Sequence, residues 1–277
     1  MMLSASFLLS LIAPTIKALN YIPLMELIFF RNLFSILIIP FIIKKKKLPF
    51  VGKEKCFLLL RSFCGFVTIV GSVYTFMKMN LTDAMAIRQL SPFFIIILAS
   101  IFLREKFERK HLFVFLISFL GALLIIKPGF RAEIFPAIVG VISILFSASG
   151  HTVLRRLRLS NHPFVIVFYF ALFSAITSAI ILLLQGNIYI PNNTEFLMLM
   201  ILGLLSFLAQ TAISYAYKFS PANIVSLYLY SRITFTSILG FIFFREMPGI
   251  LSIIGSVLII LSGYIHFGNK NDSEYFE

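Results

Sequence analysis

The sequence contains no tryptophan, only two cysteines and few acidic residues. Its 277 residues include 11 Asp and Glu against 24 Lys and Arg. Cys56 and Cys64 have no His or Cys partners at metal-binding spacing, so we interpret both as packing residues. The sequence also has no nucleophile triad, metal-binding cluster or phosphate-binding loop. It therefore predicts neither enzyme activity nor a cofactor or metal.

Apolar residues dominate the composition. They make up 60% of the chain, charged residues make up 13%, and the mean hydropathy is +0.99. A soluble domain of this size could not bury so much apolar surface, so we predict an all-α membrane protein. The net charge of +13 does not indicate nucleic-acid binding, because the basic residues cluster in short loops and no binding motif accompanies them.

Ten apolar runs follow one another along the chain, most of them close to the length of a membrane-spanning helix. The first lacks a basic leader and a small-residue cleavage site, so we expect a helix there and not a signal peptide. The expected spans are residues 1–18, 24–43, 57–77, 84–103, 112–126, 135–154, 164–184, 196–217, 223–244 and 250–267.

Basic residues in the loops predict the orientation. If both termini are cytoplasmic, fifteen Lys and Arg lie on the cytoplasmic side and five on the other side. The largest cytoplasmic groups are 44–47, 104–110 and 155–158. We therefore predict a multi-pass protein of the bacterial inner membrane with both termini in the cytoplasm.

The two halves of the chain are similar at an offset of about 141 residues. Pro23 matches Pro163, Tyr74 matches Tyr215, and the pair Arg104 and Glu105 matches Arg245 and Glu246. Each half has five expected spans, so the second half enters the membrane in the opposite direction. We expect two inverted repeats, residues 1–130 and 135–267, followed by a cytoplasmic tail at 268–277.

Further positions mark related segments in the two halves, among them Asp83 and Pro92 in the first and Lys218 and Pro221 in the second. With these residues, the segments resemble EamA-type members of the drug/metabolite transporter superfamily. The resemblance covers nearly the whole chain, and Arg88 and Arg232 depart from it, since the family commonly has apolar residues there. It implies ten helices, a central cavity and transport of small organic metabolites. The positions that match are Tyr74, Asp83, Pro92, Glu105, Gly121 and Gly129 in the first half, and Tyr215, Ala216, Lys218, Pro221, Glu246, Gly255 and Gly263 in the second.

Polar residues recur at three- and four-residue spacing on six expected helices, which places them on one face of each helix. One cavity between the halves would explain all six stripes, while packing of small residues between membrane helices is the alternative for any one of them. The stripes include Ser6 and Ser10; Arg61, Gly65, Thr68 and Ser72; Ser143, Ser147, Gly150 and His151; Ser206, Gln210 and Ser214; and Tyr228, Arg232 and Thr236.

Three arginines within expected spans give the interior a positive charge. Burying an arginine in a membrane is costly, so Arg88 and Arg232 are expected to face a cavity and hold an anionic group. A salt bridge or carbonyl clamp between helices is the alternative for both and for Arg31. Pro92 leaves the carbonyl of Arg88 without its helical hydrogen bond. Arg61, near a helix end, is expected to extend to the membrane interface, and His151 is interpreted as structural.

The candidate site follows from these stripes and charges. Glu26 is the acid best placed to carry a proton, but a neighbouring arginine would keep it charged, which favours facilitated uptake or exchange over proton symport. The candidate substrate-binding residues are Ser72, Arg88, Gln89, Ser91, Ser147, Gln210, Tyr215, Tyr228, Arg232 and Thr236, and the candidate gating or coupling residues are Glu26, Arg31 and Pro92.

The predicted function is secondary transport by alternating access. The bias toward Lys, Ile, Phe and Asn is typical of an AT-rich genome, and the family includes S-adenosylmethionine importers of reduced intracellular bacteria. The resemblance thus favours uptake or exchange of S-adenosylmethionine or a related amino-acid derivative. An amino-acid or drug exporter and a lipid or polyprenyl-phosphate flippase are the alternatives. The expected partners are a small-molecule substrate and membrane lipids, with no nucleic acid, in a monomer or homodimer.

Overall fold

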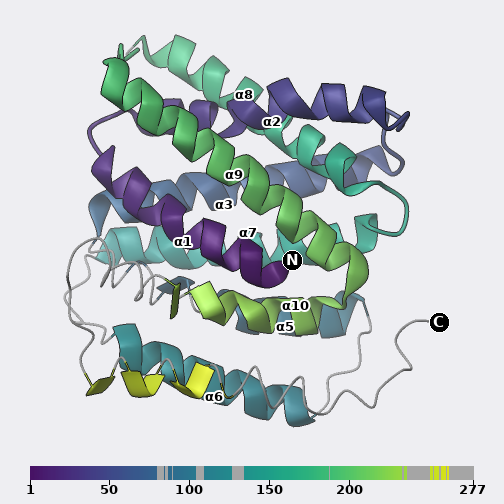
Figure 1. Ribbon diagram of the computed structural model, residues 1–277, viewed down its shortest axis with the longest axis vertical. Helices are drawn as coiled ribbons and strands as arrows, with labels where there is room; N and C mark the ends of the chain where they lie inside the picture. Colours follow the sequence, from purple (N-terminus) through teal and green to yellow (C-terminus); the bar gives the residue numbers. More distant parts are fainter. Residues whose placement is uncertain are drawn as a thin grey trace.

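Figure 1 shows the computed structural model of the chain. The structure describes residues 1–79, 84, 87–88, 90–103, 109–126, 134–186, 188–232, 234–235, 250–251, 253–255, 257–259 and 261. These residues form helices and the turns between them, and none of them lies in a β-strand.

The described helices lie where the sequence predicts membrane spans. Five of them, α2, α3, α7, α8 and α9, are long and apolar enough to cross a membrane, and α1 and α5 are shorter apolar helices. The predicted all-helical membrane fold is therefore confirmed. The helices are α1 (Met2–Ala18), α2 (Leu24–Lys45), α3 (Lys55–Lys78), α5 (Ser91–Phe102), α6 (Arg109–Ile126), α7 (Ile134–Leu157), α8 (Pro163–Gln185), α9 (Asn193–Phe219) and α10 (Ala222–Leu227), with a 3-10 turn at Tyr228–Tyr230.

Local sequence signals explain several helix ends. Before α9, the side chain of Asn192 accepts a hydrogen bond from the backbone N–H of Glu195, and the Glu195 carboxylate accepts one from the N–H of Asn192. Helix α8 ends at Gly186, whose φ of 66° lies in the left-handed region that glycine adopts readily. In the fourth expected span, Pro92 lies in the first turn of α5, where no backbone N–H is needed.

Helices from the two halves of the chain alternate in space. Helix α3 packs on α7 and α8, α9 packs on α1 and α2, and α2 packs on α8. Helix α5 packs on α7 and α10, and α6 lies at one edge of the bundle (Figure 1). The interior of the bundle is thus lined by helices that are far apart in the sequence.

Glycines allow the closest helix contacts. A Cβ at Gly71 of α3 would lie 2.5 Å from the Ser143 Cβ of α7, and one at Gly203 of α9 would lie 2.8 Å from the Phe30 carbonyl oxygen of α2. Small residues let membrane helices approach each other in this way and gain dispersion contacts.

Polar contacts join the loops at both ends of the bundle. At the predicted cytoplasmic end, Asn161 accepts from the Lys53 N–H at 2.7 Å and donates to the Lys53 carbonyl at 3.0 Å. At the opposite end, the hydroxyls of Tyr21 and Tyr189 donate to the carboxylate of Glu195 at 3.0 and 3.1 Å. At each end, therefore, hydrogen bonds join segments that are far apart in the sequence, and these bonds can break without unfolding a helix.

We predict that Gly71→Val destabilises the protein. The new side chain would overlap Ser143 and push α3 away from α7, and overpacking of this kind costs about 1–3 kcal/mol. The melting temperature of the purified protein should fall by several degrees. The matched control is Leu60→Val on an exposed face of the same helix, and equal melting temperatures for the two variants would contradict the close contact.

Candidate substrate-binding cavity

A polar cavity lies in the interior of the bundle, where helices of both halves meet. Ten polar residues contribute to its wall, and no Asp or Glu lines it in the described part of the chain. Apolar side chains such as Leu9, Ile12 and Ile69 complete the wall. The polar lining residues are Arg31, Arg61, Thr68, Ser72, Arg88, Ser91, Ser147, His151, Gln210 and Arg232.

Arg88 is held against α3. Its Nη1 atom donates to the Oγ of Ser72, and its guanidinium carbon lies 5.7 Å from the centre of the Phe76 ring. The Nε atom is buried and has no hydrogen-bond partner. A cation over an aromatic face gains only about 0.5–2 kcal/mol, so these contacts orient the guanidinium without neutralising it.

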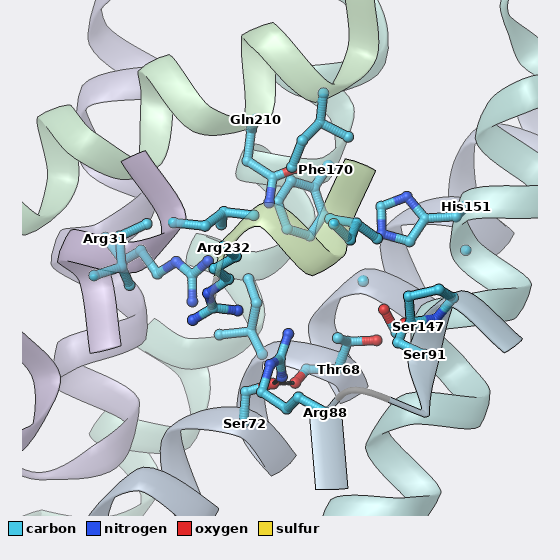
Figure 2. Close-up of a pocket in the computed structure, with 18 of the residues that line it drawn as sticks. Arg31, Thr68, Ser72, Arg88, Ser91, Ser147, His151, Phe170, Gln210 and Arg232 are labelled. Atoms are coloured by element: carbon cyan, nitrogen blue, oxygen red, sulfur yellow. Dashed lines mark hydrogen bonds between the residues drawn. The ribbon is translucent and has the colours of Figure 1, made fainter. Parts of the chain in front are cut away.

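Arg31 of α2 and Arg232 point into the same part of the cavity. Figure 2 shows their guanidinium groups close together, with Arg88 directed toward them. All three positive charges repel one another, and Arg31 and Arg232 are less than a tenth exposed. We call Arg31, Arg88 and Arg232 the arginine cluster. Its positive charge creates a strong preference for an anion.

Arg61 forms a second positive site in the same cavity. Its guanidinium carbon lies 5.0 Å from the centre of the Phe170 ring, and its Nη1 atom lies beside Gly65 and Gly150. A Cβ at Gly65 would be 2.4 Å from that nitrogen, so glycine makes room for the side chain. The predicted extension of Arg61 to the membrane interface is wrong. The residue is only 6% exposed, because its side chain fits into the space beside the two glycines and Phe170 in the interior of the bundle.

His151 lies near this second site. Its ring stacks on Tyr217 with the ring centres 5.0 Å apart, and its Nδ1 atom is buried without a hydrogen-bond partner. Ser147 lies one turn earlier on α7 and also lines the cavity. These groups can supply neutral hydrogen bonds beside the charge of Arg61.

The structure brings eight of the thirteen candidate residues to one cavity: Arg31, Ser72, Arg88, Ser91, Pro92, Ser147, Gln210 and Arg232. Gln89 and Thr236 lie outside the described residues.

The three remaining candidates lie elsewhere. Tyr215 packs against the rings of His162, Phe164 and Phe219. Tyr228 is in the 3-10 turn after α10, and its carbonyl accepts a hydrogen bond from Ser6. Glu26 is buried and accepts from the backbone N–H of Tyr189 at 3.1 Å, so it holds the loop before α9 and does not line the cavity.

Arg61, Thr68, His151 and Phe170 also line the cavity but are absent from the candidate set. Arg61 shares a helical face with Gly65, Thr68 and Ser72, so the polar stripe on α3 contained the signal that identifies it. Phe170 has no comparable signal, because α8 is apolar on all sides and carries several phenylalanines.

Comparisons with known proteins agree with a transport function. Residues 1–127 and 134–267 match the model of the EamA-like transporter family. A pseudopaline exporter from Pseudomonas aeruginosa is 30% identical over 262 residues, which cover 93% of this chain and 91% of the exporter. Human solute carrier family 35 member G1 is 25% identical, over 94% of this chain and 76% of its own. One solved crystal structure shares the fold with a TM-score of 0.82 at 14% identity, over 95% of this chain and 94% of the other.

We predict that Arg31→Met stabilises the ligand-free protein. It removes a buried charge that two other arginines repel, and replacing buried charges with apolar groups of similar volume is often neutral or stabilising by about 1–4 kcal/mol. The melting temperature of the variant should therefore be higher. At equal ionic strength, citrate should raise the wild-type melting temperature more than chloride does, and this difference should be smaller in Arg31→Met.

The matched control is Arg156→Met. Arg156 forms an exposed ion pair with Glu54 at 3.4 Å, which contributes little to stability, so this variant should keep the wild-type response to citrate. A lower melting temperature for Arg31→Met with an unchanged response to citrate would show that Arg31 has a structural partner and not an anion-binding role.

Proposed function

This chain belongs to the EamA-like transporter family, and we propose that it is a secondary carrier that exports a small organic anion by alternating access. Its relatives are membrane transporters, and this chain is likewise a membrane transporter and not an enzyme. The observation that carries the proposal for the substrate is the charge of the cavity. Its wall has four arginines, three of them buried and Arg88 partly buried, and no acidic residue among the described lining residues.

Charge balance favours an anionic substrate. Each unneutralised arginine in a membrane interior costs several kcal/mol, about 2.5–3.5 by insertion measurements. Guanidinium groups bind carboxylate or phosphate oxygens in bidentate geometry, which returns much of this energy when the substrate is present. Phe76, Phe170 and Ile69 provide apolar surface for the rest of the molecule.

The same chemistry disfavours S-adenosylmethionine. Its sulfonium is a fixed cation, and the described cavity wall offers it arginines and no carboxylate. Neither this substrate nor the predicted uptake direction has support among the relatives, whereas export has the support of the similar pseudopaline exporter. We therefore propose export of an amino-acid-derived or other carboxylate metabolite.

The proposed architecture is ten helices in two inverted repeats, residues 1–130 and 135–267, followed by the tail at 268–277. Support comes from the two family matches and from the packing, in which α3 on α7 and α8 corresponds to α9 on α1 and α2. Rocking of such repeats around a central site produces alternating access. A bacterial inner membrane, cytoplasmic termini and a monomeric or homodimeric state remain predictions.

We predict that Arg232→Leu lowers anion transport by about tenfold or more, since a hydrogen-bonded charge contributes about 1.5–3 kcal/mol. The measurement is flux of labelled glutarate, citrate, glutamate, S-adenosylmethionine and lysine in proteoliposomes. The carboxylates should be transported and the two cations should not. Arg156→Leu is the matched control and should retain wild-type flux.

Two outcomes would contradict the proposal. Flux of S-adenosylmethionine or lysine above that of every carboxylate would refute an anion carrier. In cells that express the protein, the internal pool of a transported carboxylate should fall relative to cells with Arg232→Leu, and a higher pool would refute export.

We predict that Glu26→Gln keeps both transport and its pH dependence. Glu26 accepts a backbone hydrogen bond from Tyr189, which a glutamine carbonyl can also accept, and it does not line the cavity. Carboxylate flux in proteoliposomes should stay within about twofold of the wild type between pH 6 and 8, because a neutral acceptor costs little here. Loss of flux in this variant, and in the wild type when the proton gradient is collapsed, would instead identify proton coupling through Glu26.

A further inference from the structure

The four arginines of the cavity lie at two different levels along α3. The Nη1 atom of Arg88 bonds the Oγ of Ser72, whereas the Nη1 atom of Arg61 lies against Gly65. Ser72 and Gly65 are seven residues apart, so the two guanidinium groups are separated by roughly 10 Å along the helix axis. Thr68 and Ile69 lie between these two levels, and both line the cavity.

Each level is positive and has its own hydrogen-bonding groups. The arginine cluster is beside Ser72, and Figure 2 shows Arg31, Arg88 and Arg232 grouped together on one side of the cavity. His151 and Ser147 lie on the other side of the view. They belong to α7, and so does Gly150, at which a Cβ would lie 3.7 Å from the Nη1 atom of Arg61.

Among the described residues, no carboxylate lines the cavity at either level. The Nε atoms of Arg61 and Arg88 are both buried without hydrogen-bond partners, as is the Nδ1 atom of His151. A monovalent anion on the arginine cluster would leave Arg61 without an anionic ligand. Such a charge remains costly in a low-dielectric interior.

We propose that the cavity holds two separated anionic groups of one substrate, one on the arginine cluster and the other on Arg61. The substrate class is an elongated dianion, such as a molecule with carboxylates at both ends of a short chain. Thr68 and Ile69 contact the connecting chain, and Phe170 fixes the orientation of Arg61. This inference rests on the proposed anion-carrier function.

The test compares dicarboxylates with a monocarboxylate in the wild type and in Arg61→Met. The probes are succinate, glutarate, adipate and suberate, with hexanoate as the monocarboxylate, measured by competition against flux of labelled glutarate in proteoliposomes. In the wild type, the best dicarboxylate should bind about tenfold or more tightly than hexanoate, because it gains a second charged hydrogen-bonded contact. The best chain length should fall inside the series.

Arg61→Met should lower the affinity of the best dicarboxylate by about tenfold and leave that of hexanoate within about twofold. Arg61→Lys keeps the charge and should give an intermediate loss, which provides a test if the methionine variant does not fold. Arg156→Met is the matched control on the surface and should change neither affinity.

Three results are distinguishable. Equal affinity of the wild type for adipate and hexanoate would overturn the two-level binding. Equal losses for both ligands in Arg61→Met would also overturn it, because Arg61 would then serve a single site. If no carboxylate is transported and none competes with labelled glutarate, the proposed anion carrier itself is refuted.

Discussion

Four arginines lie inside an apolar helix bundle, and the free-energy cost of placing them there is the main constraint on the structure. No carboxylate lines the cavity among the described residues. Phe76 and Phe170 lie under Arg88 and Arg61, and Ser72 fixes Arg88. Weak contacts of this kind preorganise positive charge for a ligand. The remaining features of the bundle support that arrangement.

Small residues and polar loops make the charged cavity compatible with a stable bundle. Gly71 and Gly203 bring the backbones of neighbouring helices together, while Gly65 and Gly150 leave space for the Arg61 side chain. Glycine therefore has two roles in this protein: it allows close helix packing, and it leaves space for the Arg61 side chain.

The length of the apolar runs predicted the helices, and helical periodicity predicted much of the polar cavity wall. Polar stripes at three- and four-residue spacing identify Ser72, Ser147 and Gln210 because a membrane interior penalises isolated polar groups on the lipid side. The helix count and the repeat boundaries stay predictions. Family resemblance predicted a transporter correctly, while its extension to S-adenosylmethionine uptake has no support among the relatives.

The misplaced residues have physical explanations. Gln210 and Tyr215 are five residues apart, about 140° around a helix, so Tyr215 faces the rings of α8 when Gln210 faces the cavity. Tyr228 follows the end of α10, and the 3-10 turn changes the direction of its side chain relative to a continuous helix. Rules based on regular helices cannot predict such breaks. The interface rule for Arg61 failed because it considers distance from a helix end and not the space that Gly65 of the same helix and Gly150 of α7 provide.

The cavity charge also constrains the transport cycle. In the proposed alternating-access cycle, an empty carrier that changes its orientation passes through an occluded state in which the guanidinium groups are buried without an anionic ligand. A carrier filled with an anion passes through the same state with those charges paired, at a much lower cost. In this proposed cycle, the polar contacts at the two ends of the bundle, around Asn161 and Glu195, would break in turn. For the proposed anion carrier, the same arginines would therefore also favour return of the carrier with a second anion, and we expect exchange to be faster than net export.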